Sequence, residues 1–315
     1  MNVPQMKQLF SASLLSCCLI AGLALSADPA QAEPVGITQP SGPPLLSLSA
    51  APYYQLPSSL NHGGKVAVTN LSLDLNSNIA ISRALGVGFH LGYDYTDYRF
   101  SGPVALAGLK PWGDINRLEM GVNVSYDFTP ELSLYIIPSL QFTRESDASW
   151  GKAIAYGGVV TVAYDFTPGL TLGTGVAAFN DLDKVSVLPV IVVKWQITDK
   201  LLLTNPLRPG PTGPAGLELS YTPVKHWDLA AGTTYRSNRF RLGSSGTVKE
   251  GIGESDVLPA FGRLTWKPAK YFSTDLYAGV MFGGSLFVND RNNTRISSDH
   301  YNPAPFGALA VSGHF

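Results

Sequence analysis

The chain has 315 residues, of which 14% are charged, and its formal net charge is −1. Soluble domains carry about 25% charged residues, so this composition is poor in charge. The near-neutral balance leaves no basic footprint for nucleic acid, and no nucleic-acid partner is predicted.

The N-terminal segment is predicted to be a secretory signal. Lys7 precedes an apolar run over residues 9–25, and Ala30-Gln31-Ala32 offers a small-x-small cleavage site. A transmembrane anchor is the alternative, but a spanning helix needs about 20 apolar residues and this run is shorter. The predicted organisation is a signal peptide at residues 1–32, a periplasmic segment at 33–44 and one barrel domain at 45–315.

Both cysteines, Cys17 and Cys18, lie inside the apolar run. A lipoprotein signal would place its cysteine after such a run, whereas here the run continues from Leu19 to Leu25. A cleaved signal therefore leaves a mature chain without cysteine, which excludes disulfides and thiolate chemistry.

A rhythm of short turns marks the rest of the chain. The turns fall at residues 129–131, 167–169, 198–200, 222–224 and 267–269, and the pattern Tyr-Asp-Phe-Thr-Pro occurs at both 126–130 and 164–168. Apolar residues alternate with small or polar ones on both sides of the turns. Period-two alternation is typical of strands with one face in an apolar medium, and strands joined by short turns and long loops are typical of a transmembrane β-barrel.

The clearest predicted strands cover residues 117–128, 132–142 and 272–288. Each has the about 9–11 residues that a tilted membrane strand needs. Along the last of them, residues of the parity of Phe272 are expected to face lipid up to Val288, and the others the interior. Two segments are less regular. Residues 185–197 are apolar on both faces, and residues 233–242 switch parity near Ser237, which predicts a bulge or the start of a loop.

Aromatic residues gather beside the short turns. A soluble β-sandwich would show the same alternation, but membrane barrels carry aromatic girdles at the lipid–water boundary. The predicted periplasmic girdle consists of Tyr126, Phe128, Tyr164, Phe166, Trp195, Trp266 and Phe272.

Longer, more polar connections alternate with these turns and are expected on the extracellular side. They cover residues 56–63, 101–114, 144–152, 180–184, 205–215, 243–253 and 289–302. Within them, residues 210–215 are expected to form a stiff extracellular loop. With a further turn near residues 76–83, the count predicts an all-β, antiparallel single-chain barrel of about 14 strands. Twelve is the alternative if residues 45–54 and 65–75 are not both membrane strands.

The chain ends on an alternating segment with Phe315 last. A terminal aromatic of this kind is the predicted assembly signal for the barrel assembly machinery. Together with the signal peptide and the girdle, it predicts the outer membrane of a Gram-negative cell, with outer-membrane lipids as partners.

Several short motifs carry a resemblance. They are Arg239-Phe240-Arg241-Leu242, Gly251-Ile252-Gly253-Glu254, Val187-Leu188-Pro189 and Tyr301-Asn302-Pro303-Ala304-Pro305-Phe306. The chain resembles, over most of its mature length, a family of uncharacterised bacterial outer-membrane β-barrels known as a domain of unknown function. The resemblance implies fold and location, and it brings no activity or ligand.

No catalytic constellation is found in the sequence. Gly243-Ser244-Ser245-Gly246 lacks the spacing of a nucleophile elbow, and no histidine pair has zinc-ligand spacing. Residues 290–301 lack the glycine and glutamate of a calcium loop. The chain is therefore predicted not to be an enzyme and to use no cofactor or metal.

Polar residues with interior parity are the candidate lumen lining. Their side chains would either pass solutes or cross-link neighbouring strands and fill the bore, as Arg117 and Glu119 could. Acidic residues outnumber basic ones among the interior charges, which predicts a weak preference for cations. The lining candidates are Asp94, Arg117, Glu119, Asn123, Lys194, Glu218, Arg263 and Asp275.

The leading functional hypothesis is a monomeric, passive channel or transporter for small solutes. The alternatives are a closed barrel with a structural or loop-binding role and, third, an outer-membrane enzyme. Strand number leaves the first two open, because eight strands leave a filled interior and about 16–18 leave an aqueous channel.

Overall fold

The computed structural model describes residues 45–102, 106, 111–182, 184–206, 210–213 and 215–315. The predicted signal peptide, the periplasmic segment and both cysteines lie outside these residues. Within them, the helix η2 is a single 3-10 turn at Trp150–Lys152. Across the described ranges, no helix has the length and apolar character to cross a membrane.

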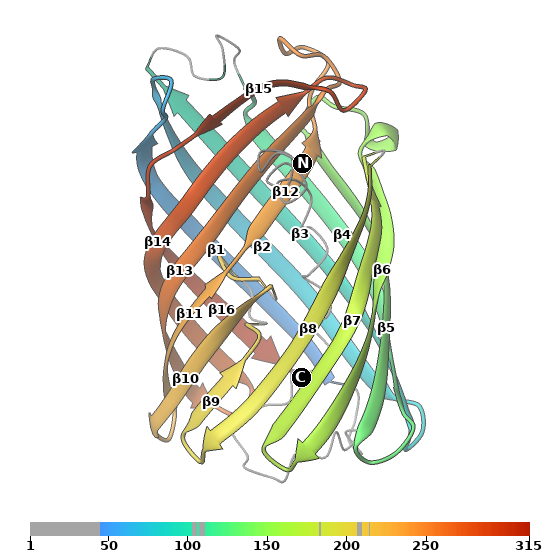
Figure 1. Cartoon of the computed structure of the whole chain (residues 1–315). Coiled ribbons are helices and arrows are strands. Elements are labelled where there is room, and N and C mark those ends of the chain that lie inside the picture. Colours follow the sequence, from blue (N-terminus) through green and yellow to red (C-terminus); the bar gives the residue numbers. More distant parts are fainter. Residues whose placement is uncertain (1–44, 103–105, 107–110, 183, 207–209, 214) are drawn as a thin grey trace, which may run out of the picture.

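Fourteen antiparallel strands form a closed ring (Figure 1). The first and last strands close it, with Tyr54 opposite Gly307. The predicted count of 14 is confirmed, and the alternative of 12 is wrong because β1 and β2 are full strands of 15 and 16 residues. The ring strands are β1 (Leu45–Ser59), β2 (Lys65–Ala80), β3 (Leu85–Ser101), β4 (Asp114–Asp127), β5 (Leu132–Glu145), β6 (Ile154–Thr167), β7 (Leu170–Asp181), β8 (Lys184–Thr198), β9 (Leu201–Thr204), β10 (Gly216–Val224), β11 (Trp227–Thr234), β13 (Ile252–Ala269), β14 (Phe272–Asn289) and β16 (Ala304–His314).

Two further strands extend ring strands at the end of the barrel that carries the longer connections, called here the loop end. β12 (Arg236–Arg241) continues β11 after an interruption at Tyr235, close to the predicted irregularity at Ser237. β15 (Arg295–His300) pairs with β14, so the expected loop at residues 289–302 contains a strand. The expected loop at residues 180–184 is shorter than predicted, since β7 ends at Asp181 and β8 begins at Lys184.

Burial alternates along the strands as the sequence pattern predicts. On β14, Phe272 and Leu276 are exposed, whereas Tyr277 is buried. The predicted parity of this strand holds to Phe282 and is then wrong. A bulge at Gly283, where φ is +61°, turns Leu286 and Val288 into the interior.

The barrel wall is short at β9, which has only four residues beside the 15 of β8. After β9 the chain turns into the barrel interior instead of continuing alongside β8 towards the loop end. Residues 210–213 are buried, and Gly210 packs against Tyr277 of β14 and Ala51 of β1. The expectation of an extracellular loop here is therefore wrong. A ring of 14 strands encloses more space than inward side chains fill, and this compact Gly-Pro segment occupies part of it.

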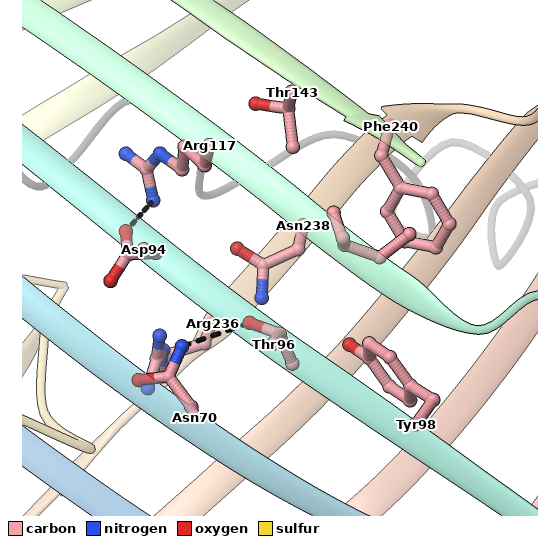
Figure 2. Close-up of a pocket in the computed structure, with 10 residues that line it drawn as sticks. Asn70, Asp94, Thr96, Tyr98, Arg117, Thr143, Arg236, Asn238 and Phe240 are labelled. Atoms are coloured by element: carbon pink, nitrogen blue, oxygen red, sulfur yellow. Dashed lines mark hydrogen bonds and ion pairs between the residues drawn. The ribbon is translucent and has the colours of Figure 1, made fainter. Parts of the chain in front are cut away.

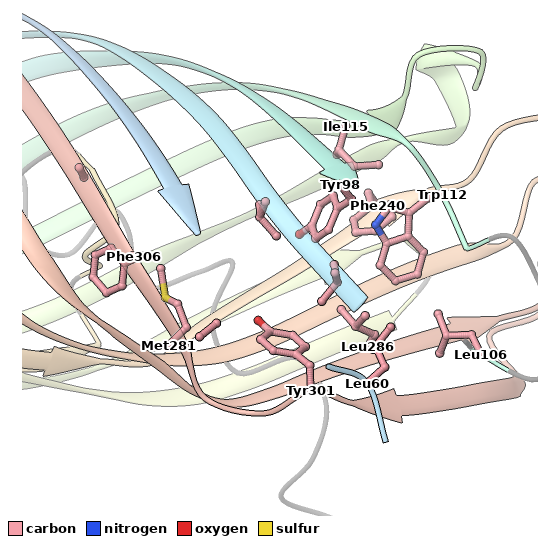
Figure 3. Packing of buried hydrophobic residues seen from close by; sticks show 14 of the residues in the cluster. Leu60, Tyr98, Leu106, Trp112, Ile115, Phe240, Met281, Leu286, Tyr301 and Phe306 are labelled. Atoms are coloured by element: carbon pink, nitrogen blue, oxygen red, sulfur yellow. The ribbon is translucent and has the colours of Figure 1, made fainter. Parts of the chain in front are cut away.

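Apolar side chains pack inside the ring at the loop end (Figure 3). Trp112 and Phe240 meet edge to face with their ring centres 5.0 Å apart, and Tyr98 lies 5.6 Å from Trp112. Aromatic pairs in this geometry contribute about 0.5–1.5 kcal/mol beyond their area burial. These three residues, the aromatic cluster, join β12 to β3 across the interior.

The bulge at Gly283 provides a test of the register. Gly283→Ala is expected to lower the free energy of unfolding by about 1–2 kcal/mol, because a Cβ is strained at positive φ. Open space surrounds Gly283, so the loss comes from the backbone alone. Gly246→Ala is the matched control, since Gly246 is also in open space but without positive φ. Urea unfolding of the refolded barrel measures both, and equal midpoints would contradict the strained bulge.

Candidate functional site

The interior of the ring is the candidate functional site. The structure places the eight predicted lining residues on β3, β4, β8, β10, β13 and β14 with interior parity. Asp94, Asn123 and Lys194 are half-buried, and the other five are buried. The seven predicted girdle aromatics are all exposed and lie beside the short turns at the opposite end of the barrel, the short-turn end.

A first charge network joins β2, β3 and β4. The Arg117 guanidinium donates to the Glu119 carboxylate and lies 3.8 Å from Asp94 Oδ2. The Ser72 hydroxyl in turn donates to Asp94. All of these groups project from the inner faces of neighbouring strands, so the network ties the wall together as much as it lines a passage.

A second network joins β10, β13 and β14. The Arg263 guanidinium donates to Glu218, with an Nε–Oε2 distance of 3.1 Å, and to Asp275 at 3.2 Å. Thr265 donates to Asp275 at 2.5 Å. The arginine and both carboxylates are buried. Buried ions are tolerated only when paired in this way, because removing them from water costs several kcal/mol per ion.

A third network was not predicted from the sequence. Arg239 of β12 is 1% exposed and donates to Glu254 of β13 and to Asn293, each at 2.9 Å. Its Nε lies 3.7 Å from Asp181 at the end of β7. Arg239 thus holds β12 across the interior. The one signal in the sequence is the parity switch at residues 233–242, which coincides with three arginines.

Two adjoining cavities lie inside the ring. The first, of about 20 Å³, lies between β12 and the inner wall of β2 to β5 (Figure 2). The second has about 10 Å³. Tyr98, Arg236 and Asn238 line both cavities. Volumes of this size hold about one water molecule each, so a larger solute fits only when the groups around them move.

Arg236 differs from the other interior arginines. No ion pair joins it to any residue that the structure describes, and its buried Nη1 has no hydrogen-bond partner there. Its guanidinium carbon lies 5.7 Å from the centre of the Tyr53 ring. Nε of Arg117, on the wall of the first cavity, also lacks a partner. The cavities therefore present unused donors, which suit a solute that carries acceptor oxygens.

The cation preference predicted from the charge count disagrees with this geometry. The count treated each carboxylate as free, but Glu119, Glu218 and Asp275 are bonded to arginines. Among the described interior charges, Arg236 is the one facing both cavities without an ion-pair partner. The charged residues that line the two cavities are Asp94, Arg117 and Arg236, and their summed charge is positive.

The inner faces of β5 to β8 share an apolar cluster, beside polar residues such as Thr143, Thr161 and Ser186. This cluster, called here the apolar patch, is unusual, because barrel interiors are ordinarily polar. β12 separates it from the cavities, since Arg236, Asn238 and Phe240 face the cavities whereas Arg239 faces Asp181. The patch consists of Ile137, Val159, Ala177, Phe179, Leu188, Val190 and Val192.

Connections at the loop end are bonded to one another. Glu145 accepts from the backbone N–H groups of Gly113 and Gly243 at 3.0 and 2.8 Å. The Ser245 hydroxyl donates to Asp147 at 2.5 Å, and this bond holds the pKa of the Asp147 carboxyl below its usual range. In the part of the chain that is described, no group of three His, Asp or Glu side chains is arranged to hold a metal ion.

Loss of the arginine from the second network is expected to lower the stability of the barrel strongly, and removal of the remaining charges is expected to restore most of that stability. Arg263→Ala removes the guanidinium from between the buried carboxylates of Glu218 and Asp275, and is expected to lower the free energy of unfolding by about 3–5 kcal/mol. Arg263→Met combined with Glu218→Gln and Asp275→Asn removes all three charges and is expected to restore most of it. Urea unfolding of the refolded barrel measures both. A triple variant as unstable as Arg263→Ala would show that the charges themselves do not set the loss.

Solved structures of β-barrels are similar to the chain at low sequence identity. It is similar to the COG4313 outer membrane channel from Pseudomonas putida F1, with a TM-score of 0.47 at 11% identity, covering 92% of this chain and 100% of that one. It is also similar to the P. putida toluene transporter TodX, with a TM-score of 0.41 at 11% identity, covering 88% of this chain and 91% of TodX. The translocator domain of the autotransporter NalP from Neisseria meningitidis has a TM-score of 0.38 at 11% identity, with coverage of 88% and 91%.

Sequence comparison gives the family. No curated protein matches the chain. A family model described as a domain of unknown function (DUF6268) matches residues 117–311, which run from β4 into β16. The resemblance seen in the short motifs is thereby confirmed, and the chain belongs to this family of unknown function.

Proposed function

We propose that the chain is exported through cleavage of its N-terminal signal and forms a channel for small solutes in the outer membrane of a Gram-negative cell. The observation that carries this proposal is Arg236, a half-buried cation inside the ring that faces both small cavities and has no ion-pair partner among the described residues. A barrel with a purely structural role needs no unpaired charge in its interior, and eight strands would give it a filled interior. The long-loop end is taken as extracellular.

The proposed channel is occluded in this conformation. β12 crosses the interior, and its end lies beside β5, where Arg241 is next to Arg144. The Arg241 Nε donates to the carbonyl of Lys152 at 2.8 Å. Together with the backbone pairing of β12 with β13, Arg239 and the aromatic cluster, these contacts hold β12 beneath the loop end. A solute therefore passes only when β12 moves.

Arg236 is proposed to read the charge of the solute. It is the unpaired cation of both cavities and has the Tyr53 ring beneath it. A small molecule with an acidic group would complete the missing charge pair, and the rings of Tyr98 and Phe240 would pack on its body. Charge-assisted bonds to a guanidinium are about twice as strong as neutral ones.

Planar-bilayer recording of the refolded protein tests conduction and charge preference. The wild-type chain is expected to conduct in discrete steps and to favour anions. Arg236→Gln is expected to shift the reversal potential in a salt gradient towards cation preference, because it removes the unpaired charge. Lys225→Gln is the matched control, since Lys225 is exposed at a short turn and loses the same charge outside the bore. A folded barrel without conductance steps would favour the closed-barrel alternative, and equal shifts in both variants would reject Arg236 as the determinant.

Release of β12 provides a second test. Arg239→Gln combined with Glu254→Gln removes the side-chain ion pair between β12 and β13 without leaving Glu254 charged, and leaves their backbone pairing in place. It also removes the ion pair of Arg239 with Asp181 on β7, across the interior, and is therefore expected to raise the frequency or size of the conductance steps. The Arg263, Glu218 and Asp275 triple variant is the control, because it alters the wall and leaves β12 in place. An unchanged current in the Arg239 and Glu254 variant would contradict Arg239 as the residue that holds β12 in the bore.

A further inference from the structure

The barrel wall has an incomplete ladder on one side of β8 (Figure 1). Towards β7 the pairing is continuous and reaches Lys184 opposite Asp181. Towards β9 the pairs run only from Thr198 to Lys194, and Val193 adds a bond from its N–H to Asn205 Oδ1 at 2.8 Å. Beyond that point, no described strand pairs with this edge of β8.

The direction of the unpaired groups follows from Val193. Its N–H and its C=O both bond to Asn205, on the side away from β7. Backbone groups alternate in direction along a strand, so those of residues 191, 189, 187 and 185 point to the same open side. Position 189 is a proline and carries no N–H, which removes one donor from that edge.

Exposure supports the missing neighbour. Val185, Val187 and Ile191 are 72%, 63% and 68% exposed. Outward residues of the fully paired strand β7 are less exposed, with Leu172 at 39% and Val176 at 48%. The higher exposure of the β8 residues is expected when one of the two flanking strands is absent and no longer covers their side chains.

This edge lies at the depth of the membrane. With about 3.4 Å per residue along a strand tilted by about 40°, Ile191 and Val185 lie about 10 and 26 Å from Trp195 along the membrane normal. The apolar band of such barrels is about 25 Å tall. An unsatisfied backbone group in hydrocarbon costs several kcal/mol and is tolerated only in protein or beside water. The open edge therefore needs water from the interior.

The interior surface behind the open edge carries apolar residues along the middle of β8. Leu188, Val190 and Val192 belong to the apolar patch and lie on β8 itself. At this gap the backbone groups of β8 contact water, whereas the inner side chains of β8 are apolar. Such a surface suits a molecule with a hydrocarbon or aromatic body. Residues 185–197 were apolar on both faces in the sequence, and this location accounts for that pattern.

We propose that the gap beside β8 is a lateral opening through which small molecules with an apolar body pass between the interior and the outer leaflet. This rests on the proposed channel function and adds the class of substrate and its exit. β12 leans inward where a full-height neighbour of β8 would otherwise close the wall.

Uptake of an apolar probe tests the opening. Cells of a Gram-negative host that produce the full chain are mixed with N-phenyl-1-naphthylamine, which fluoresces when it enters the membrane. The wild-type chain is expected to speed its entry, and Val190→Asp to slow that entry roughly tenfold, because a charge in an apolar site is costly. Ala308→Asp is the control, since Ala308 is also buried with interior parity but lies on the fully paired β16. It is expected to leave the entry unchanged.

A second variant distinguishes a blocked opening from a folding defect caused by the buried charge. Ser186→Trp adds bulk on the inner face of β8 without adding charge, and is expected to slow entry as Val190→Asp does. Heat-modifiable migration in gels checks folding, and ion conductance is measured in parallel. If ion conductance persists but the rate of probe entry is the same in the wild type and all variants, the proposal of a lateral opening is wrong and the proposed channel function stands. Loss of both conductance and probe entry in the folded wild type would overturn both.

A second copy of the chain covering the open edge is the remaining outcome. The mature chain has no cysteine, so Val187→Cys introduces a single thiol at the edge and Val176→Cys a matched one on β7. Under mild oxidation neither is expected to form dimers. A disulfide-linked dimer with Val187→Cys alone would show an interface between copies and overturn the opening.

Discussion

Satisfaction of backbone hydrogen bonds inside a membrane is the constraint on which the rest of this structure depends. A ring of strands meets it, because each strand pairs with two neighbours and no edge remains in lipid. Fourteen strands meet it with a bore wider than side chains fill. The inward Gly210–Gly213 segment, β12 and the aromatic cluster all occupy that surplus space. The open edge of β8 is the place where the constraint is met least, and the wall there is open to the interior.

Three arginines in the bore share one arrangement. Arg117, Arg239 and Arg263 each lie within ion-pair distance of carboxylates on two different strands. Guanidinium suits this role because its planar fork satisfies several acceptors at once. Arg236, which faces both cavities, has no such partner among the described residues. Paired arginines hold the wall and β12, whereas the unpaired one remains available to a solute.

Most features of the barrel wall could be predicted from the sequence, but few of the features of the barrel interior could. Period-two alternation and the recurring turns were sufficient for strand number and parity, since both depend on local contrast between lipid and interior. The inward path of residues 210–213 was not predictable, because Gly-Pro segments are equally compatible with an external loop. Arg236 could be distinguished from Arg263 only through partners distant in the chain, Glu218 among them. At Gly283 a single positive φ reversed the parity of the residues that follow, and alternation alone carries no sign of it.

The pairing of β1 with β16 has a consequence for how the chain matures. These strands are the first and last of the ring, so their contact closes the longest loop in the molecule. Until β16 is in place, β1 exposes one edge and β14 exposes its edge from Phe272 to Met281, and such edges are templates for aggregation. A chain that ends before Ala304 lacks one strand but exposes two strand edges, each able to pair with another chain. Closure of the ring is therefore also the step that removes the edges at which copies of the protein could aggregate.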